Sequence, residues 1–399
     1  MTHPARTRSS HTTVQGNIHR PGDPHYDTQR ATENPAFNAT PAIIVEAANP
    51  ADVQATVTWA RDQNLPLAIQ STGHGTHVPS DGGVLLKTSQ MKTVLVDPDR
   101  RIARIGAGAI WQDVITAAAP FGLAPVSGSH ASVGVAGFTM GGGLGALSRK
   151  YGLGADNLLR ADLVTADGEL VIATRDRNPD LFWAIRGGGG NFGVVTSMEI
   201  ELHQVDEVYA GQALLPKARA ADVLDRFRAY APEMPEELTC TIAVTKEHVA
   251  VRATYLGQAD AARKALEPLG VADAFDEGPV PGTAPKHFEL FNELPDIDTV
   301  IEVAEEANVE VRYWGGAIAR GESPAGHRNV PFSIIVDGPD AAAERLWPYA
   351  TGGSFLNFLR DPSAVETAYT AADYQLLREV KACYDPANVF HRNLNIKPA

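Results

Sequence analysis

Residues 127–145 read SGSHASVGVAGFTMGGGLG, and they are the most distinctive stretch of the chain. Seven of these 19 residues are glycine, and small or hydroxyl-bearing side chains make up most of the others. Glycine loses much conformational freedom on folding, so such a cluster indicates backbone that bends sharply or lies close to a ligand. The interspersed valine and phenylalanine residues are too apolar for a flexible Gly/Ser linker. The stretch therefore predicts a backbone cradle for phosphates or for a flat ring.

The glycines are unevenly distributed along the whole chain. Of the 36 glycines, 22 lie between Gly73 and Gly193, which is about 18% of that segment. The other 14 make up about 5% of the remaining 278 residues, against a usual value of ~7%. This distribution excludes a simple all-helical protein.

Composition and charge exclude several classes of function. The 399 residues have room for two or three domains. The net charge of −14 opposes a nucleic acid or an anionic membrane as partner, since both need a basic surface. The two cysteines, Cys240 and Cys383, cannot make a disulfide scaffold or a CxxC pair, and we predict no metal site. No apolar run approaches the ~18 residues of a membrane span, and the basic N-terminus lacks the apolar core of a secretory signal. We expect a soluble, cytoplasmic protein.

The pattern of apolar residues changes near residue 205. Before it, residues 42–70 predict a strand, a helix and a strand, and Asp167-Gly168 predicts a hairpin turn. After it, residues 215–238 predict one amphipathic helix. Further predicted strands and another helix follow, which indicates an antiparallel sheet with helices on one side over about 205–345.

A second candidate site lies at residues 70–77, which read QSTGHGTH. Successive backbone N–H groups in a glycine-rich turn form a nest for an anion such as a pyrophosphate. His74 would then lie at the ligand surface, where an imidazole nitrogen can act as a nucleophile. Two alternatives stay open, an ordinary loop histidine and a zinc pair of His74 with His77.

Two more segments complete the pattern. Residues 186–195, RGGGGNFGVV, join an apolar helix to a strand and lack the context of a dinucleotide-binding Rossmann motif. Near the end, YDPANVF at 384–390 is followed by Asn393 and Asn395, whose amides offer donors and acceptors to a polyhydroxyl chain or a ring edge.

These four segments, in this order, resemble the FAD-linked oxidases of the vanillyl-alcohol oxidase (PCMH-type) superfamily, and more narrowly the berberine-bridge-enzyme-like branch in its bacterial form. The likeness covers about 40–205 and 350–399. The resemblance implies an α+β fold with a PCMH-type FAD-binding domain of two α/β subdomains and an antiparallel-sheet substrate domain. The expected divisions are a polar segment at 1–38, the FAD-binding domain at 39–205, the substrate domain at 206–350 and a C-terminal return at 351–399.

The resemblance also implies the cofactor site. His74 matches the histidine that family members bond to FAD. A cysteine that many members use for a second bond is Ala155 here, so a single covalent attachment is expected. The other residues expected to line FAD are Ser71, Thr72, Gly73, Gly75, Thr76, His77, Ser132, Val133, Gly134, Gly137, Thr139, Gly142, Gly143, Gly145, Asp156, Asn157, Gly193, Val194, Asn393 and Asn395.

The substrate side departs from the family pattern. Phe355, Phe358 and Ile334 stand where members often place a phenolic or carboxylate base. Tyr313, Arg312 and His130 are the candidate replacements, and each of them also has a purely structural interpretation. Because strand side chains alternate, Arg312 and Trp314 should share one face, with Tyr313 on the other.

These features lead to one main hypothesis and its competitors. The main one is a covalent-FAD oxidase that takes hydride from a small alcohol, sugar or secondary-metabolite C–H to flavin N5. O2 would be the acceptor and H2O2 the product, with natural-product tailoring as the expected role. Val133 at the family's small position favours that reaction with oxygen. The alternatives are a redox-neutral FAD-containing cyclase or isomerase and a non-catalytic flavin-binding protein. The sequence identifies neither the substrate nor the oligomeric state.

Overall fold

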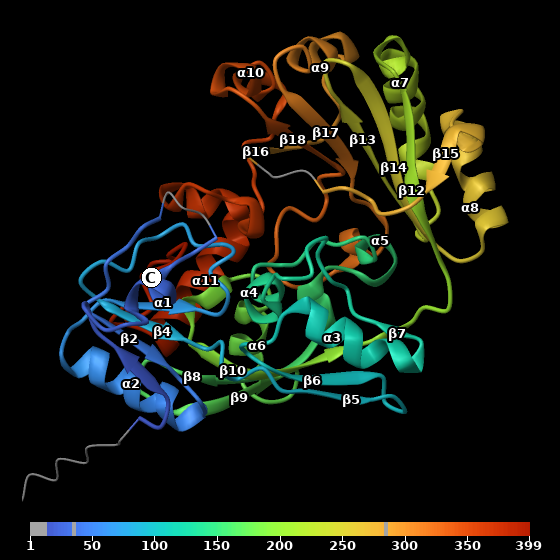
Figure 1. Ribbon diagram of the computed structural model, residues 1–399. Helices are drawn as coiled ribbons and strands as arrows, with labels where there is room; N and C mark the ends of the chain where they lie inside the picture. Colours follow the sequence, from blue (N-terminus) through green and yellow to red (C-terminus); the bar gives the residue numbers. More distant parts are fainter. Residues whose placement is uncertain (1–13, 34–36, 283–285) are drawn as a thin grey trace, which may run out of the picture.

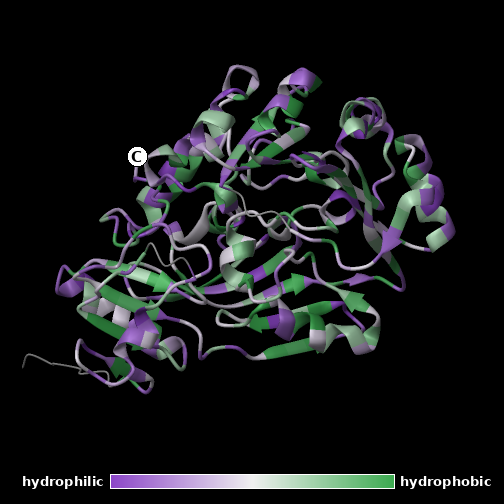
Figure 2. Ribbon diagram, turned by 45° about the horizontal axis from the view of Figure 1, so that its top comes forward, coloured by the Kyte–Doolittle hydropathy of each residue, from purple (hydrophilic) through white to green (hydrophobic). Residues whose placement is uncertain are grey.

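The chain folds into two bodies that face each other. The computed structural model describes residues 14–33, 37–282 and 286–399. Residues 14–33, 37–204 and 351–399 form the first, which we call the glycine-rich body, and residues 208–282 and 286–350 form the seven-stranded body (Figure 1). The strands of the glycine-rich body are largely hydrophobic in Figure 2, as their burial requires. Both the mixed α+β class and the antiparallel sheet are as predicted.

The glycine-rich body begins with a four-stranded sheet in the order β1-β2-β4-β3. Its strands are β1 (Asn17–His19), β2 (Ile43–Glu46), β3 (Leu67–Gln70) and β4 (Val84–Lys87), with α1 (Tyr26–Arg30) and α2 (Pro50–Asp62) beside them. The Asn49 side chain caps α2 by accepting from the Asp52 N–H, and Pro50 occupies the favoured first turn. The helix connects parallel strands, so the predicted strand, helix and strand at 42–70 are confirmed.

The described part of the predicted polar segment 1–38 is not merely a tail. Residues 14–33 include β1, which pairs antiparallel to β2, and α1. Residues 1–13 and 34–36 lie outside the described residues.

A five-stranded antiparallel sheet, in the order β5-β6-β10-β8-β9, forms the second half of this body. The Asp167-Gly168 hairpin between β8 and β9 is confirmed, and Gly168 has the positive φ (+87°) that such turns need. The strands are β5 (Val94–Asp97), β6 (Ile102–Gly106), β8 (Leu158–Val164), β9 (Leu170–Thr174) and β10 (Val194–Glu201), with a small sheet of β7 (Leu123–Ala124) and β11 (His203–Gln204). The helices are α3 (Trp111–Ala118), α4 (Val135–Met140), α5 (Ser148–Tyr151) and α6 (Pro179–Ile185).

The seven-stranded sheet is antiparallel throughout, in the order β15-β12-β14-β13-β17-β18-β16. Its strands are β12 (Val208–Pro216), β13 (Leu238–Val244), β14 (His248–Leu256), β15 (Phe275–Glu277), β16 (His287–Phe291), β17 (Asn308–Tyr313) and β18 (Phe332–Asp337). One face packs against α7 (Ala220–Tyr230), α8 (Ala259–Leu266), α9 (Ile297–Val303) and α10 (Asp340–Glu344). The other face turns toward the glycine-rich body (Figure 1).

The prediction of one helix over 215–238 was wrong at both ends, since Leu238 already begins β13. Residues 208–216 form β12, and α7 covers only 220–230. The strand was missed because it carries Gly211 and alanines in place of β-branched residues. Gly211 is needed there, since a Cβ would lie 2.1 Å from the Asp276 carbonyl oxygen of neighbouring β15. The edge strand β16 was missed too.

The C-terminal residues return to the glycine-rich body. Helix α11 (Ala371–Tyr384) packs beside α6, and Ile396 is fully buried in the same core as Trp111 and Phe192. Short 3-10 turns shape the backbone near the site, at Gly154–Asn157, Gly189–Asn191, Gly316–Arg320 and Leu356–Phe358.

Candidate functional site

His74 lies in the loop that follows β3, at the end of a parallel strand. Gly73 before it has φ of +82°, a conformation that favours glycine. The His74 side chain is 39% exposed, and its Nδ1 lies 2.5 Å from Glu33 Oε2. Its ring centroid is 6.2 Å from that of His130, which comes from the glycine loop. The fold thus brings together two predicted site histidines 56 residues apart in sequence.

The first part of the glycine loop lies against the His74 loop. A Cβ on Gly134 would lie 3.2 Å from Ser71 Oγ and 3.4 Å from a Thr72 methyl group. The Oγ of Ser71 and the Oγ1 of Thr139 are buried, with no hydrogen-bond partner among the described residues. Gly137 faces open space. Buried hydroxyls need partners, so this arrangement calls for a polar ligand between the two loops.

The second part of the loop is tied to residues 355–358. Asn357 Oδ1 accepts from the Gly143 N–H at 2.7 Å, and Gly142 has φ of +115°. A Cβ on Gly142 would lie 2.5 Å from the Phe355 ring. Glycine is therefore required at 142 by close packing as well as by backbone conformation.

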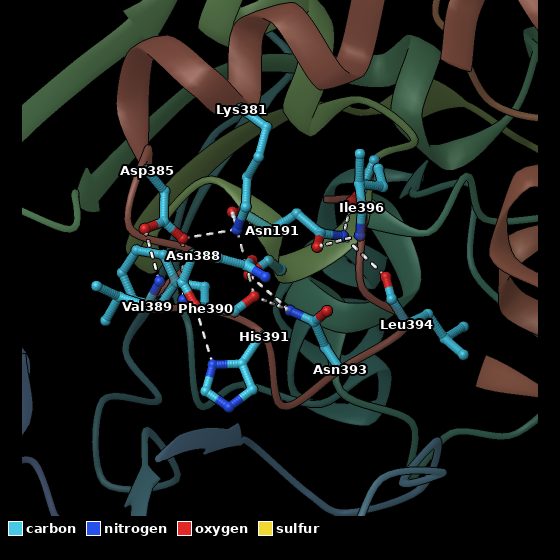
Figure 3. Close-up of polar contacts among 12 residues, drawn as sticks. Asn191, Lys381, Asp385, Asn388, Val389, Phe390, His391, Asn393, Leu394 and Ile396 are labelled. Carbon is cyan, nitrogen blue, oxygen red and sulfur yellow. Dashed lines mark hydrogen bonds and ion pairs between the residues drawn. The ribbon is translucent and has the colours of Figure 1, made fainter. Parts of the chain in front are cut away.

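A buried ion pair organises the C-terminal segment (Figure 3). Lys381 and Asp385 side chains are fully buried, with Nζ 2.6 Å from Oδ2. Lys381 also donates to the Asn191 carbonyl at 2.7 Å, while Asp385 accepts from the N–H groups of Val389 and Phe390. Desolvation lowers the pKa of Lys381, and the Asp385 charge opposes that effect.

Asn191 and Asn393 connect this ion pair to the glycine turn at 188–193. Asn191 accepts from the Ile396 N–H and donates to the Gly188 and Leu394 carbonyls. Asn393 Nδ2 donates to the Gly190 and Phe390 carbonyls (Figure 3). The Oδ1 atoms of Asn393 and Asn395 are buried without a hydrogen-bond partner in the described part of the chain.

Asp156 and Asn157 have protein partners. Arg328 donates to both Asp156 oxygens, at 2.7 and 2.8 Å. Asn157 donates to the Tyr151 and Leu153 carbonyls. Its Oδ1 lies 2.6 Å from the Nε2 of His203, whose ring stacks on Tyr151 at 3.8 Å. Burial lowers the pKa of His203 to about 4. Asp156 also accepts from the Leu153 N–H at 2.9 Å, so both residues support the backbone of this loop.

The remaining predicted cofactor residues are spread around these loops. Ala155 is fully buried beside Leu153 and Trp314, where the two bodies meet. His77 packs edge-on against Phe37, and burial lowers its pKa. Gly75, Ser132 and His74 are exposed, Thr76 and Val133 are half-buried, and Gly145 and Gly193 lie against the backbone of Ser127 and Val164. Val194 is buried at the start of β10.

Residues 308–314 alternate across the sheet as predicted. Tyr313 packs into the helix-side core, with its ring 5.2 Å from that of Phe332 and the Arg149 guanidinium over it. Arg312 and Trp314 lie on the opposite face, toward the glycine-rich body. Tyr313 and Arg312 are therefore not brought together.

Ile334 belongs to the helix-side core, and its neighbour Ile335 faces the glycine-rich body. Glu310 stands directly opposite Ile335 on β17. Phe355 is fully buried beside Trp314. The Ile334 side chain thus lies on the sheet face opposite to the one that covers the glycine loop. Residues 355 and 358 are both phenylalanine, so neither supplies an aromatic hydroxyl.

Sequence reasoning missed several polar residues near this face. Glu310 is buried between Arg252, at 2.8 Å, and Arg312, at 2.6 Å. The alternation in NVEVRY at 308–313 could have revealed its pairing with Arg312 but not the contribution of Arg252. Glu289, which was missed as well, is not on this face: it stands opposite Ile334 and lines a separate cavity of about 520 Å³, where burial raises its pKa to about 7.

Among the described residues there is neither a metal-binding cluster nor a helix that could span a membrane. No group of three or more side chains there is placed to hold a metal ion, so the zinc alternative for His74 and His77 gains no support. No helix in those ranges combines the length and the apolar character that crossing a membrane requires.

Comparisons with known proteins agree with this arrangement. Residues 41–174 match the family model described as an FAD binding domain, and residues 354–397 match the one described as berberine and berberine like. An FAD-linked oxidoreductase of Dictyostelium discoideum is 30% identical over 96% of this chain and 95% of its own. The (R)-6-hydroxynicotine oxidase of Paenarthrobacter nicotinovorans is 39% identical over 48% of this chain and 42% of its own. The crystal structure of 6-hydroxy-D-nicotine oxidase from Arthrobacter nicotinovorans has a TM-score of 0.86 and 26% identity, covering 98% of this chain and all of the other.

Proposed function

We propose, on the premise that this chain belongs to the FAD-linked oxidoreductases of the berberine-bridge-enzyme-like type, that it is an oxidase carrying FAD on His74. The enzyme class and the cofactor follow from the family. The covalent bond, the substrate and O2 as the acceptor are parts of the proposal.

One observation carries it, the set of buried oxygens around the glycine cradle that have no hydrogen-bond partner among the described residues. They come from Ser71, Thr139, Asn393 and Asn395, which lie in three separate segments. A dinucleotide with a ribityl chain and a ring edge supplies donors over such a span. The residues present therefore fit FAD, held between the His74 loop, the glycine loop and the C-terminal segment.

His74 is placed for a single attachment. Glu33 is hydrogen-bonded to Nδ1, so in the described residues Nε2 remains available as the nucleophile. Ala155 has no nucleophilic side chain and is fully buried, which excludes a second bond at that position.

FAD held by these residues would supply the redox chemistry, with a substrate C–H as the hydride donor, O2 as the electron acceptor and H2O2 as the product. The protein positions the substrate under the seven-stranded sheet, whose inner face packs through Trp314 and Ile335 against Leu153 and Ala155. This packing keeps bulk water away from the centre of the interface. Small alcohols, sugars and secondary-metabolite phenols or amines are the candidate substrates, and a role in natural-product tailoring in the bacterial cytoplasm remains part of the prediction.

Acid precipitation tests the covalent bond. Flavin absorbance should remain with the precipitated wild-type protein and move to the supernatant in His74→Ala. His248→Ala, at a partly buried histidine of β14 in the seven-stranded body, is the matched control and should keep the bound flavin. An intact mass of the denatured wild-type protein without one added FAD would refute the histidyl attachment.

A redox-neutral role is the second candidate, because Phe355 and Phe358 offer no base. A peroxide-coupled screen separates the two. Peroxide formed in proportion to the substrate consumed supports the oxidase, whereas turnover without peroxide supports the cyclase or isomerase.

A further inference from the structure

The Arg312 guanidinium lies on the sheet face that covers the glycine loop, and only part of it is hydrogen-bonded among the described residues. Its Nε donates to Glu310 Oε1 at 2.6 Å, and its Cζ lies 5.6 Å from the Phe358 ring centroid. Glu310 therefore holds the Nε edge of the guanidinium, and the Phe358 ring lies against one of its faces. Among the described residues, no hydrogen bond uses its Nη1 or Nη2, and the side chain is 18% exposed.

The surrounding contacts place this guanidinium over the cofactor cradle. Phe358 follows Asn357, which accepts from the Gly143 N–H. On the same sheet face, the Thr239 hydroxyl donates to the Ala146 carbonyl at 2.7 Å. Both contacts join this part of the molecule to the end of the glycine loop, so the Nη edge of Arg312 lies on the sheet face that packs toward that loop.

Arg252 and Arg312 both pair with Glu310, so these three largely buried groups together carry one positive charge. A guanidinium whose two Nη groups are unused matches a carboxylate in bidentate geometry. Glu310 and Phe358 hold that fork in one orientation, which reduces the entropy lost on binding.

We propose that Arg312 binds a carboxylate group of the substrate, with Glu310 and Phe358 as positioning residues. The substrate is then a small organic acid whose oxidisable C–H lies close to the carboxylate. This inference rests on the proposed function, since it names the substrate class of the same site. The proposal also explains why residue 358 is phenylalanine. A phenyl ring is sufficient to contact the Arg312 guanidinium, and a phenolic hydroxyl is not needed there.

The test uses the holoenzyme with benzoate as the probe and benzamide as its neutral counterpart. Isothermal titration measures both affinities, and the flavin difference spectrum reports whether the probe lies beside the ring. We expect benzoate to bind at least tenfold more tightly than benzamide. Arg312→Gln should remove that preference, and Arg312→Lys should keep part of it because the charge remains without the fork. Circular dichroism establishes that both variants are folded.

Arg320→Gln is the matched control, since Arg320 is an exposed arginine paired with Glu236. It should leave benzoate affinity unchanged. The inference is overturned if wild-type protein does not prefer benzoate, if Arg312→Gln binds it as wild type does, or if only a phenolate probe such as 4-nitrophenolate binds. Benzoate binding that depends on Arg312 in protein without covalent flavin would support this inference while refuting the histidyl attachment.

Discussion

Replacing Lys381 by methionine tests how strongly the C-terminal segment depends on its buried ion pair. The change removes the ammonium and leaves the fully buried Asp385 carboxylate with only the N–H groups of Val389 and Phe390. Removing one partner of such a pair costs about 3–5 kcal/mol. The Asn191 carbonyl loses its donor as well. We therefore expect the free energy of unfolding to fall by about 4 kcal/mol.

A double-mutant cycle in urea, followed by tryptophan fluorescence, measures this coupling. Asp385→Asn alone should also destabilise, because it leaves the buried ammonium without its counter-ion. The double variant Lys381→Met/Asp385→Asn buries no charge, so its cost should fall short of the sum of the single costs by about 2–3 kcal/mol.

Lys286→Met is the control for the loss of a lysine. Its ion pair with Asp340 is exposed, so it should cost less than about 1 kcal/mol. A cost below about 1 kcal/mol for Lys381→Met, or additive costs in the cycle, would refute the role given to the ion pair. FAD content of the same variants then shows whether Asn393 and Asn395 depend on it.

Three further predictions concern the loops. Gly142→Ala should destabilise and reduce bound flavin in purified protein, since φ is +115° and the new methyl group would lie 2.5 Å from Phe355; flavin content equal to wild type would contradict this. The pKa of His203 is lowered from 6.5 to about 4 in the folded protein, so between these pH values the unfolded chain binds more protons. The free energy of unfolding should therefore fall as the pH drops from 6.5 to 4, and His203→Phe should flatten the pH dependence of the urea midpoint over that range. Glu33→Gln should slow covalent attachment to His74 in a flavin-incorporation time course, because a neutral partner at Nδ1 makes Nε2 less nucleophilic, and an unchanged rate would exclude that role.

The sequence was most informative where local rules govern the backbone. Turn glycines, helix caps and alternating strands depend on neighbouring residues, and so the hairpin at Asp167-Gly168 and the faces of Arg312 and Trp314 could be predicted. The glycine loop could be recognised but not its contacts. Gly142 is required partly because Phe355 reaches it from more than 200 residues away.

The polar surroundings of the site could not be predicted, because they join distant strands and loops. Glu310 is paired by Arg252 from β14, and Asp156 by Arg328 from the other body. No local pattern links these positions. The edge strand β16 was missed for a similar reason, since its pairing with β18 supplies the order that its short sequence does not.

The order in which the cradle segments are synthesised has a consequence for loading the cofactor. Residues 70–77 and 127–145 leave the ribosome long before Asn393 and Asn395, with the whole seven-stranded body made in between. A nascent chain that ends before these asparagines contains the two early loops but lacks the segment that Lys381 and Asn191 anchor. If these segments hold the flavin as proposed, the complete cradle forms only after the last residues have been made and docked.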